Sequence, residues 1–214
     1  MQILITGGNG YIGSHLTNTL LEKGYSLHAL IYPGTDASEL LAQGVKVFTG
    51  DIRDYRSVER AAEGCEQVYH LASYVSLWAP EPDIFYDINV KGTQNLLNVC
   101  RNSSVRRVLI CSSCAVFGPS ENGDIVDETT DYSARLKGHY EWSKFQQVEV
   151  AKNYLKDGLE IVFVYPARVF GPRIKSAKSA VSSIIEGVLR GSWHIIPGNG
   201  KSVANYVFVN DVVK

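Results

Sequence analysis

The chain has 214 residues, of which 45% are hydrophobic and 20% charged, and its formal net charge is -1. This length suits one large domain, or one domain and part of another. A near-neutral charge gives no indication of a nucleic-acid surface or a polybasic membrane patch. No apolar run approaches the roughly 20 residues that span a bilayer, and no signal peptide precedes the first glycines. With four cysteines and no export signal, we expect a reduced, cytoplasmic setting.

Short apolar runs alternate with amphipathic stretches along most of the chain. The runs have the two-sided apolar character of buried parallel strands, and they lie at 2–6, 26–32, 45–49, 67–71, 107–111 and 160–165. Helical patterns lie between them at 12–23, 58–62, 90–101 and 140–156. This alternation predicts an α/β fold with a doubly wound parallel sheet and right-handed crossovers.

The pattern changes toward the end of the chain. Residues 122–138 are polar and are interpreted as a surface loop. Beyond residue 174 the sequence predicts a helix at 180–189, a Gly- and Pro-rich turn at 196–200, a strand at 205–209 and the opening of another helix at 211–214. An ending at that point looks like a truncation.

A glycine-rich turn, GGNGYIG at residues 7–13, follows the first predicted strand. It fits G-x-G-x-x-G through Gly8, Gly10 and Gly13, and G-x-x-G-x-x-G through Gly7 in place of Gly8. Glycines permit a tight turn and the close approach of a pyrophosphate, and the helix that follows points N–H groups at it. An ordinary strand-to-helix turn is the alternative, but the context matches the dinucleotide fingerprint. The expected contacts of an NAD or NADP pyrophosphate are Gly7, Gly10, Tyr11, Ile12 and Gly13.

The sequence leaves the choice between NAD and NADP open. An acid at the end of the second strand would bind the ribose 2′-OH of NAD, but this strand ends at Tyr32 with neither an acid nor an arginine. Tyr32 either flanks the adenosine or simply ends the strand. Asp51 is a candidate acceptor for the adenine amino group, with Ile52 packed on the ring. A helix N-cap is the alternative role for this acidic stretch, which Asp54 would serve equally well.

Tyr140 and Lys144 share a face at the start of a predicted helix. A neighbouring ammonium stabilises a phenolate and lowers the pKa of tyrosine from about 10, the tuning that general acid–base catalysis requires. Such a pair alone is better explained as a pair on the surface of a helix. Serines that end the strand at 107–111 add weight, because ligands bind beyond the carboxyl ends of parallel strands. We infer that Ser113 donates a hydrogen bond to a substrate oxygen and that Tyr140 is the acid/base. Lys144 would be the residue that lowers the pKa of Tyr140.

Two other features favour structural roles. Cys111 and Cys114 form a C-x-x-C pair, but the pair closes a strand, and no second Cys/His pair has zinc spacing. We therefore expect no metal site. His70 ends the fourth predicted strand, where a hydrogen-bonded structural histidine is commoner than a catalyst.

Together these motifs resemble the extended short-chain dehydrogenase/reductase family. The matching segments are the glycine turn, 50–52, 70–72, 89–93, 112–113, Tyr140-x-x-x-Lys144 and 165–172, in family order. Residues 77–82 and the second strand resemble its dihydroflavonol-4-reductase-like and nucleotide-sugar-epimerase-like branch. The resemblance implies a dinucleotide-binding Rossmann-type domain over 1–172 and the start of a small substrate-binding lobe over 173–214.

The resemblance also implies a reaction and residue roles. Hydride passes between the nicotinamide and a carbonyl or alcohol carbon of a small molecule, in a reductase or an epimerase, with Ser113, Tyr140 and Lys144 as the catalytic group. Lys144 would also hold the nicotinamide ribose, and Asn89 would support the site. The remaining implied cofactor contacts are Leu71 and Ala72 in the middle, and Pro166, Ala167 and Val169 at the nicotinamide end.

Two departures from the family limit these implications. Sugar dehydratases of the family carry an Asp-Glu pair where this chain has Cys114 and Ala115, which disfavours dehydration. Family members also continue well past this chain's end, into the lobe that recognises the substrate. A homodimer through the helix of Tyr140 is expected by analogy alone. The alternatives to an enzyme are a non-catalytic cofactor-binding sensor and a scaffold protein, and the scaffold leaves the glycine turn unexplained.

Overall fold

The computed structural model describes the chain except for residues 121–124, 130–135, 137, 173–178, 196–198 and 202. The predicted loop at 122–138 and the predicted turn at 196–200 therefore fall partly outside the described residues.

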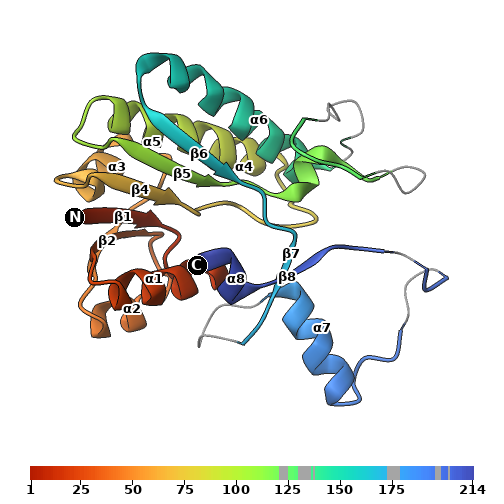
Figure 1. Ribbon diagram of the computed structural model, residues 1–214. Helices are drawn as coiled ribbons and strands as arrows, with labels where there is room; N and C mark the ends of the chain where they lie inside the picture. The colour runs from red at the N-terminus through yellow and green to blue at the C-terminus, as the bar shows by residue number, and fades with distance from the viewer. Residues whose placement is uncertain (121–124, 130–135, 137, 173–178, 196–198, 202) are drawn as a thin grey trace.

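Six parallel strands form one sheet in the order β3-β2-β1-β4-β5-β6 (Figure 1). The strands are β1 (Gln2–Thr6), β2 (Ser26–Ile31), β3 (Lys46–Thr49), β4 (Gln67–His70), β5 (Arg107–Cys111) and β6 (Glu160–Val164). In β1, Ile3 and Ile5 pack on one face and Leu4 on the other, and none of the three is exposed. Burial on both faces is why the runs are apolar throughout. The predicted doubly wound Rossmann-type fold is confirmed, with every predicted strand end within one residue.

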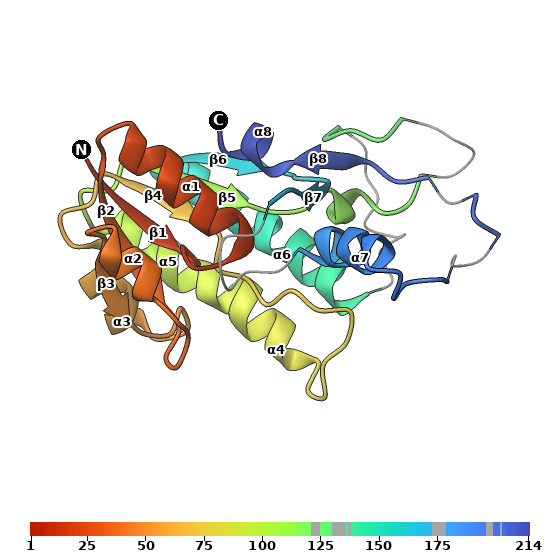
Figure 2. The same ribbon diagram turned by 90° about the horizontal axis from the view of Figure 1, so that it is seen from below.

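Helices cover both faces of the sheet (Figures 1 and 2). The helices α1 (Tyr11–Glu22), α2 (Ser38–Ala42) and α8 (Val209–Val213) lie on one side, and α3 (Tyr55–Ala62), α5 (Gly92–Arg101) and α6 (His139–Tyr154) on the other. A buried apolar cluster fills each interface. No helix within the described ranges combines the length and the apolar character needed to cross a bilayer.

Several elements differ from the sequence predictions. The helix expected at 90–101 begins earlier, as α4 (Asp83–Tyr86) and a π-helical turn η1 (Asp87–Lys91) that lead into α5. Helix α6 ends in a 3-10 turn, η4 (Leu155–Asp157). The helix α2, the strand β7 (Arg168–Phe170) and the 3-10 turn η2 (Cys114–Phe117) were not predicted.

The last part of the chain packs against the first. Strand β7 pairs in parallel with β8 (Tyr206–Phe208), and α7 (Ala180–Leu189) lies between them in the chain. Helix α8 then lies beside α1, where Val213 joins the apolar cluster that contains Leu16 and Leu20 (Figure 2). The proposed boundary between 172 and 173 stays a prediction.

Candidate active site

The site lies at the carboxyl ends of the strands, where the order of the sheet reverses. The chain runs from β1 to β2 on one side, while β4 pairs with β1 on the other, and ligands of doubly wound sheets bind at such a point. A cavity of about 1560 Å³ opens there. Ligand pockets are typically about 300–1,000 Å³, so the space suits a dinucleotide together with a second molecule. All the predicted catalytic and cofactor-binding residues line this cavity.

The glycine turn distinguishes the two motif alignments that the sequence left open. Gly7 has a φ of +72°, and a Cβ there would lie 2.8 Å from the backbone nitrogen of Ala72. A Cβ on Gly13 would overlap the carbonyl oxygen of Gly7. Gly8, in contrast, has ordinary room for a Cβ, with its nearest neighbour 3.5 Å away. The geometry therefore requires the G-x-x-G-x-x-G set.

The start of α1 fits the diphosphate of a dinucleotide. Its N-cap, Gly10, receives no side-chain hydrogen bond, and the first turn contains no acidic residue. The first amides of a helix have no partner within the helix and need an outside acceptor, and the dipole favours an anion. The absence of side chains at Gly7 and Gly10 leaves the approach open.

The end of the cavity where the adenosine is predicted to lie contains an ion pair. Arg53 donates from Nη2 to Asp51 Oδ2 at 2.6 Å, and hydrogen bonding with Arg53 holds the pKa of Asp51 below its usual range. Asp54, rather than Asp51, caps α3, since it accepts a hydrogen bond from the Arg56 amide. Tyr32 follows the end of β2, lines the cavity and is exposed. Asp51 is thus not the N-cap of α3, while both roles considered for Tyr32, beside the adenosine or simply at the strand end, stay predictions.

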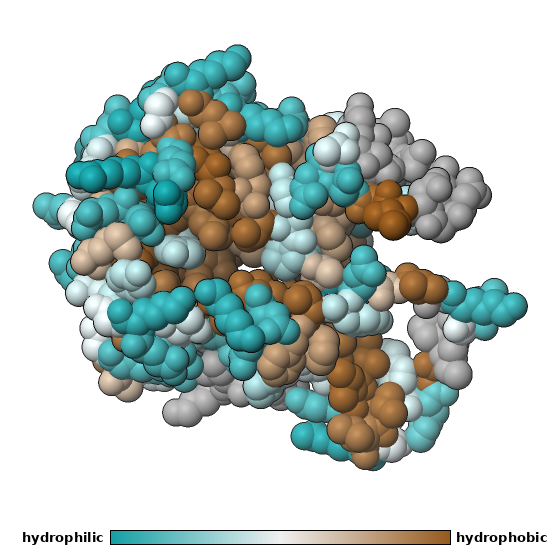
Figure 3. Space-filling model, in the orientation of Figure 1, coloured by the Kyte–Doolittle hydropathy of each residue, from teal (hydrophilic) through white to brown (hydrophobic). Residues whose placement is uncertain are grey.

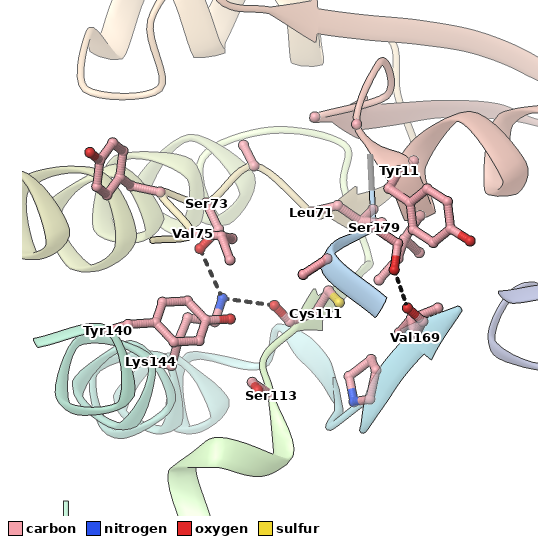
Figure 4. Close-up of a pocket in the computed structure, with 18 of the residues that line it drawn as sticks. Tyr11, Leu71, Ser73, Val75, Cys111, Ser113, Tyr140, Lys144, Val169 and Ser179 are labelled. Atoms are coloured by element: carbon pink, nitrogen blue, oxygen red, sulfur yellow. Dashed lines mark hydrogen bonds between the residues drawn. The ribbon is translucent and has the colours of Figure 1, made fainter. Parts of the chain in front are cut away.

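Three side chains from two elements form the candidate catalytic group (Figure 4). Ser113 follows β5, and Tyr140 and Lys144 lie on the first turns of α6. The buried ammonium of Lys144 donates to the Cys111 carbonyl oxygen at 2.9 Å and to Ser73 Oγ at 3.4 Å. Cys111 is the last residue of β5 and Ser73 lies in the loop that follows β4, so the ammonium is held where these two neighbouring strands end.

The pKa values of this group differ from the sequence expectation. Burial raises the pKa of Tyr140 to about 12, and hydrogen bonding with Ser113 offsets part of that rise. Burial also lowers the pKa of Lys144 to about 8, because desolvation disfavours the charged form of each group. The expected lowering of the Tyr140 pKa by Lys144 is therefore absent from the protein alone. At neutral pH the phenol holds its proton and can donate it.

Asn89 braces the loop that follows β4. Its Oδ1 accepts from Ser73 Oγ at 2.9 Å and from the Tyr74 amide at 2.7 Å. Its Nδ2 donates to the Tyr74 carbonyl and to Ser143 Oγ. Asn89 belongs to η1, and such π-helical turns are frequent at functional sites. The support expected from Asn89 thus takes the form of four hydrogen bonds.

His70 is a buried structural residue in this network. Nδ1 lies 2.7 Å from Thr6 Oγ1, and Nε2 lies 2.9 Å from Thr93 Oγ1. Burial lowers the pKa of His70 to about 3, so the ring is neutral at ordinary pH and has both nitrogens occupied. This geometry agrees with the interpretation made from the sequence.

Sequence reasoning missed the partners of the candidate catalytic residues. Ser73, which contacts Lys144, lies in the segment singled out for His70, but the sequence indicated no contact across 71 positions. Arg53 is two positions from Asp51, the predicted adenine contact. Apart from this closeness in the sequence, nothing indicated the bidentate pair that the two residues form. The apolar cavity residues of α7 were visible in the sequence only as one face of a helix.

Comparison with known proteins agrees with this architecture. The family model described as the NAD dependent epimerase/dehydratase family matches residues 3–214. A putative dihydroflavonol 4-reductase of Synechocystis is 31% identical over 169 residues, which cover 78% of this chain and 49% of that protein. Sterol demethylase protein B of Methylococcus capsulatus is 33% identical over 173 residues, with coverage of 80% and 52%. The chain thus spans about half the length of these relatives.

A solved structure gives the same result for the fold. The UDP-glucose 4-epimerase of Thermus thermophilus, in complex with NAD, superposes with a TM-score of 0.87 and 31% identity, covering 100% of this chain and 72% of that one. The expectation of a nicotinamide dinucleotide cofactor is confirmed at the level of the family. The resemblance inferred from the motifs is confirmed too: this chain belongs to the NAD dependent epimerase/dehydratase family of extended short-chain dehydrogenases/reductases.

Proposed function

We propose that this chain carries the cofactor-binding and catalytic part of a hydride-transferring enzyme, a reductase or an epimerase, that acts on a carbonyl or alcohol carbon of a small molecule. A bound NAD or NADP supplies or accepts the hydride. The glycine turn would hold the pyrophosphate, Asp51, Ile52 and Tyr32 would contact the adenosine, and Leu71 and Ala72 would line the middle of the cofactor. Pro166, Ala167 and Val169 would contact the nicotinamide end.

The residues of the chain act on the substrate oxygen. In the direction of reduction, the C=O π bond opens as hydride reaches the carbon, and Tyr140 transfers its phenolic proton to the oxygen. Ser113 donates a hydrogen bond to that oxygen and stabilises its developing negative charge. The pKa of Tyr140, raised to about 12 by burial, keeps the phenol protonated but makes it a weak acid, so proton transfer needs the phenolate to be stabilised as it forms. Lys144, held by Cys111 and Ser73, compensates the phenolate that forms.

One observation carries the proposal. The cavity that begins at a glycine turn suited to a diphosphate also contains Ser113 and Tyr140, side by side at the end of β5. A cofactor-binding sensor would need the first feature and has no use for the second. The acid/base pair within reach of the cofactor therefore favours an enzyme.

The test replaces the proton donor alone. We expect Tyr140→Phe to lower turnover by roughly 100- to 10,000-fold, the usual contribution of general acid–base catalysis, while affinity for NAD and NADP stays within a few-fold. The matched control is Tyr154→Phe, because Tyr154 lies on the same helix and its hydroxyl contacts Asn98 outside the cavity. Equal turnover in Tyr140→Phe and Tyr154→Phe would reject the assigned role.

A further inference from the structure

Lys144 is the cation of the candidate catalytic group, and it is buried. Its exposed fraction is 1%, so the ammonium has given up water and depends on acceptors that the protein supplies. Figure 3 shows largely hydrophobic residues around the hollow beside the site, with α7 among them. In such surroundings a hydrogen bond to a charge is stronger than it is in water. The groups that accept from this ammonium therefore help to decide whether Lys144 keeps its proton.

The ammonium of Lys144 has two acceptors among the described residues (Figure 4). They are the Cys111 carbonyl oxygen at 2.9 Å and Ser73 Oγ at 3.4 Å. An ammonium has three N–H donors, and two fixed directions on a tetrahedral nitrogen also fix the third. Lys144 lines the cavity, so the third N–H is the one that remains for a molecule in the cavity or for the Tyr140 phenolate.

Asn89 determines which way the Ser73 hydroxyl points. The Tyr74 amide can only donate, and it contacts Asn89 Oδ1 at 2.7 Å, while the Tyr74 carbonyl oxygen can only accept, and it contacts Asn89 Nδ2 at 3.1 Å. The oxygen and the nitrogen of the Asn89 side chain are therefore unambiguous. Ser73 Oγ lies 2.9 Å from this Oδ1, which has no proton to give, so the serine must donate. The lone pairs of Ser73 Oγ then remain available to Lys144.

The titratable side chains around Lys144 are His70 on β4, Cys111 on β5 and Tyr140 on its own helix. Burial lowers the pKa of His70 to about 3, and the charge of Lys144 adds to this effect. Burial raises the pKa of the Cys111 thiol above its usual range and the pKa of Tyr140 to about 12. Near pH 8 all three groups are uncharged, so the charge of Lys144 is held by neutral acceptors.

We propose that Ser73 is a positioning residue for Lys144. Asn89 takes the Ser73 proton in a hydrogen bond, and the serine oxygen accepts from the ammonium. This contact keeps Lys144 charged and directs its third N–H into the cavity. The inference rests on the proposed function in one step only, in which the charged Lys144 compensates the Tyr140 phenolate.

The charge of Lys144 can be measured without turnover. NMR of carbon-13-labelled lysine follows the side-chain carbon beside the ammonium through a pH titration, and Lys144→Arg identifies the signal by its loss. In the unmodified chain we expect a pKa of about 8, where burial has lowered it. Ser73→Ala should lower this pKa further, by roughly 0.5 to 1, because a hydrogen bond to a charged group favours the charged form. Ser73→Thr keeps the hydroxyl and should restore the pKa.

The matched control removes another hydrogen bond of the same buried network. Ser143 is 2% exposed, and its Oγ accepts from Asn89 Nδ2 at 2.9 Å and donates to the Tyr140 carbonyl oxygen at 2.8 Å. Ser143→Ala therefore takes one partner from Asn89 but leaves both acceptors of Lys144 in place. We expect the Lys144 pKa to stay unchanged in this variant.

The outcomes keep the two proposals apart. An unmoved pKa in Ser73→Ala, or an equal fall in Ser73→Ala and Ser143→Ala, would overturn the positioning role, since the second result is what a general loosening of the network produces. If the fall is confined to Ser73→Ala but Tyr140→Phe turns over as fast as Tyr154→Phe, Ser73 positions the ammonium and the proposed catalytic function fails.

Discussion

At the scale of single residues, the glycine turn allows a sharp prediction. Gly8 and Gly13 belong to the same loop, yet a Cβ on Gly13 would overlap the Gly7 carbonyl oxygen, while a Cβ on Gly8 meets ordinary contact distances. We expect Gly13→Ala to lose measurable NAD and NADP binding, because the turn must open where the diphosphate would sit. Gly8→Ala should keep the affinity within a few-fold.

Thermal-shift titration with the four nucleotide forms would measure both glycine variants. Similar shifts in Gly8→Ala and Gly13→Ala would mean that the turn tolerates a side chain at either place. The G-x-x-G-x-x-G geometry would then not hold the cofactor.

At the scale of elements, His70 connects β1, β4 and α5 through its two ring nitrogens. Thr93 Oγ1 donates its proton to the Asn89 carbonyl, so Nε2 must donate to Thr93, and Nδ1 of the neutral ring accepts from Thr6. Protonation of Nδ1 would remove that acceptor. Burial also disfavours the charged ring, and it lowers the pKa of His70 from 6.5 to about 3.

This link predicts a loss of stability in acid. Between pH 6.5 and pH 3, His70 is protonated in the unfolded chain but stays neutral in the folded chain. The free energy of unfolding therefore falls as the pH drops toward 3. The full effect is up to roughly 5 kcal/mol. Urea unfolding of the unmodified chain and His70→Gln at pH 7 and pH 4.5 should show a smaller pH effect in the variant. The control, His194→Gln, changes an exposed histidine and should follow the unmodified chain.

The elements also show how far the sequence could predict the fold. Strands such as β1 were readable because Ile3, Leu4 and Ile5 are buried on both faces. Strand β7 was not, since three residues give no periodicity and its partner β8 lies 38 positions away at Arg168 and Tyr206. The extra turns α4 and η1 were missed because helical spacing breaks at a π turn.

For the site, local sequence motifs identified the residues, but they did not predict properties that depend on the folded structure. Ser113, Tyr140 and Lys144 line one cavity because strand ends and helix starts converge in this fold, which a motif can signal. The direction of the Tyr140 pKa was missed, because burial outweighs the hydrogen bond with Ser113 and burial depends on the whole fold. The apolar cavity residues of α7 depend on this helix returning to the cavity, which sequence spacing does not reveal.

At the scale of the whole molecule, the end of the chain is bound into the body of the fold. Val209 is completely buried where α8 begins, and a Cβ on Gly171 would lie 2.7 Å from its Cγ1. Helix α8 in turn packs on α1 through Val213. If residues 173–214 formed an independent lobe, damage at Val209 would leave the sheet as stable as before.

We expect the opposite, a single cooperative unit. Val209→Asp buries a carboxylate without a partner and should lower the free energy of unfolding by on the order of 3 kcal/mol. Far-UV circular dichroism reports mainly on elements before residue 173, since these contain most of the helices and strands. Its urea midpoint should therefore fall in Val209→Asp and stay unchanged in Asn210→Asp, an exposed neighbour on α8. An unshifted midpoint in Val209→Asp would instead mean that the sheet is stable without α8, as a separate lobe over 173–214 requires.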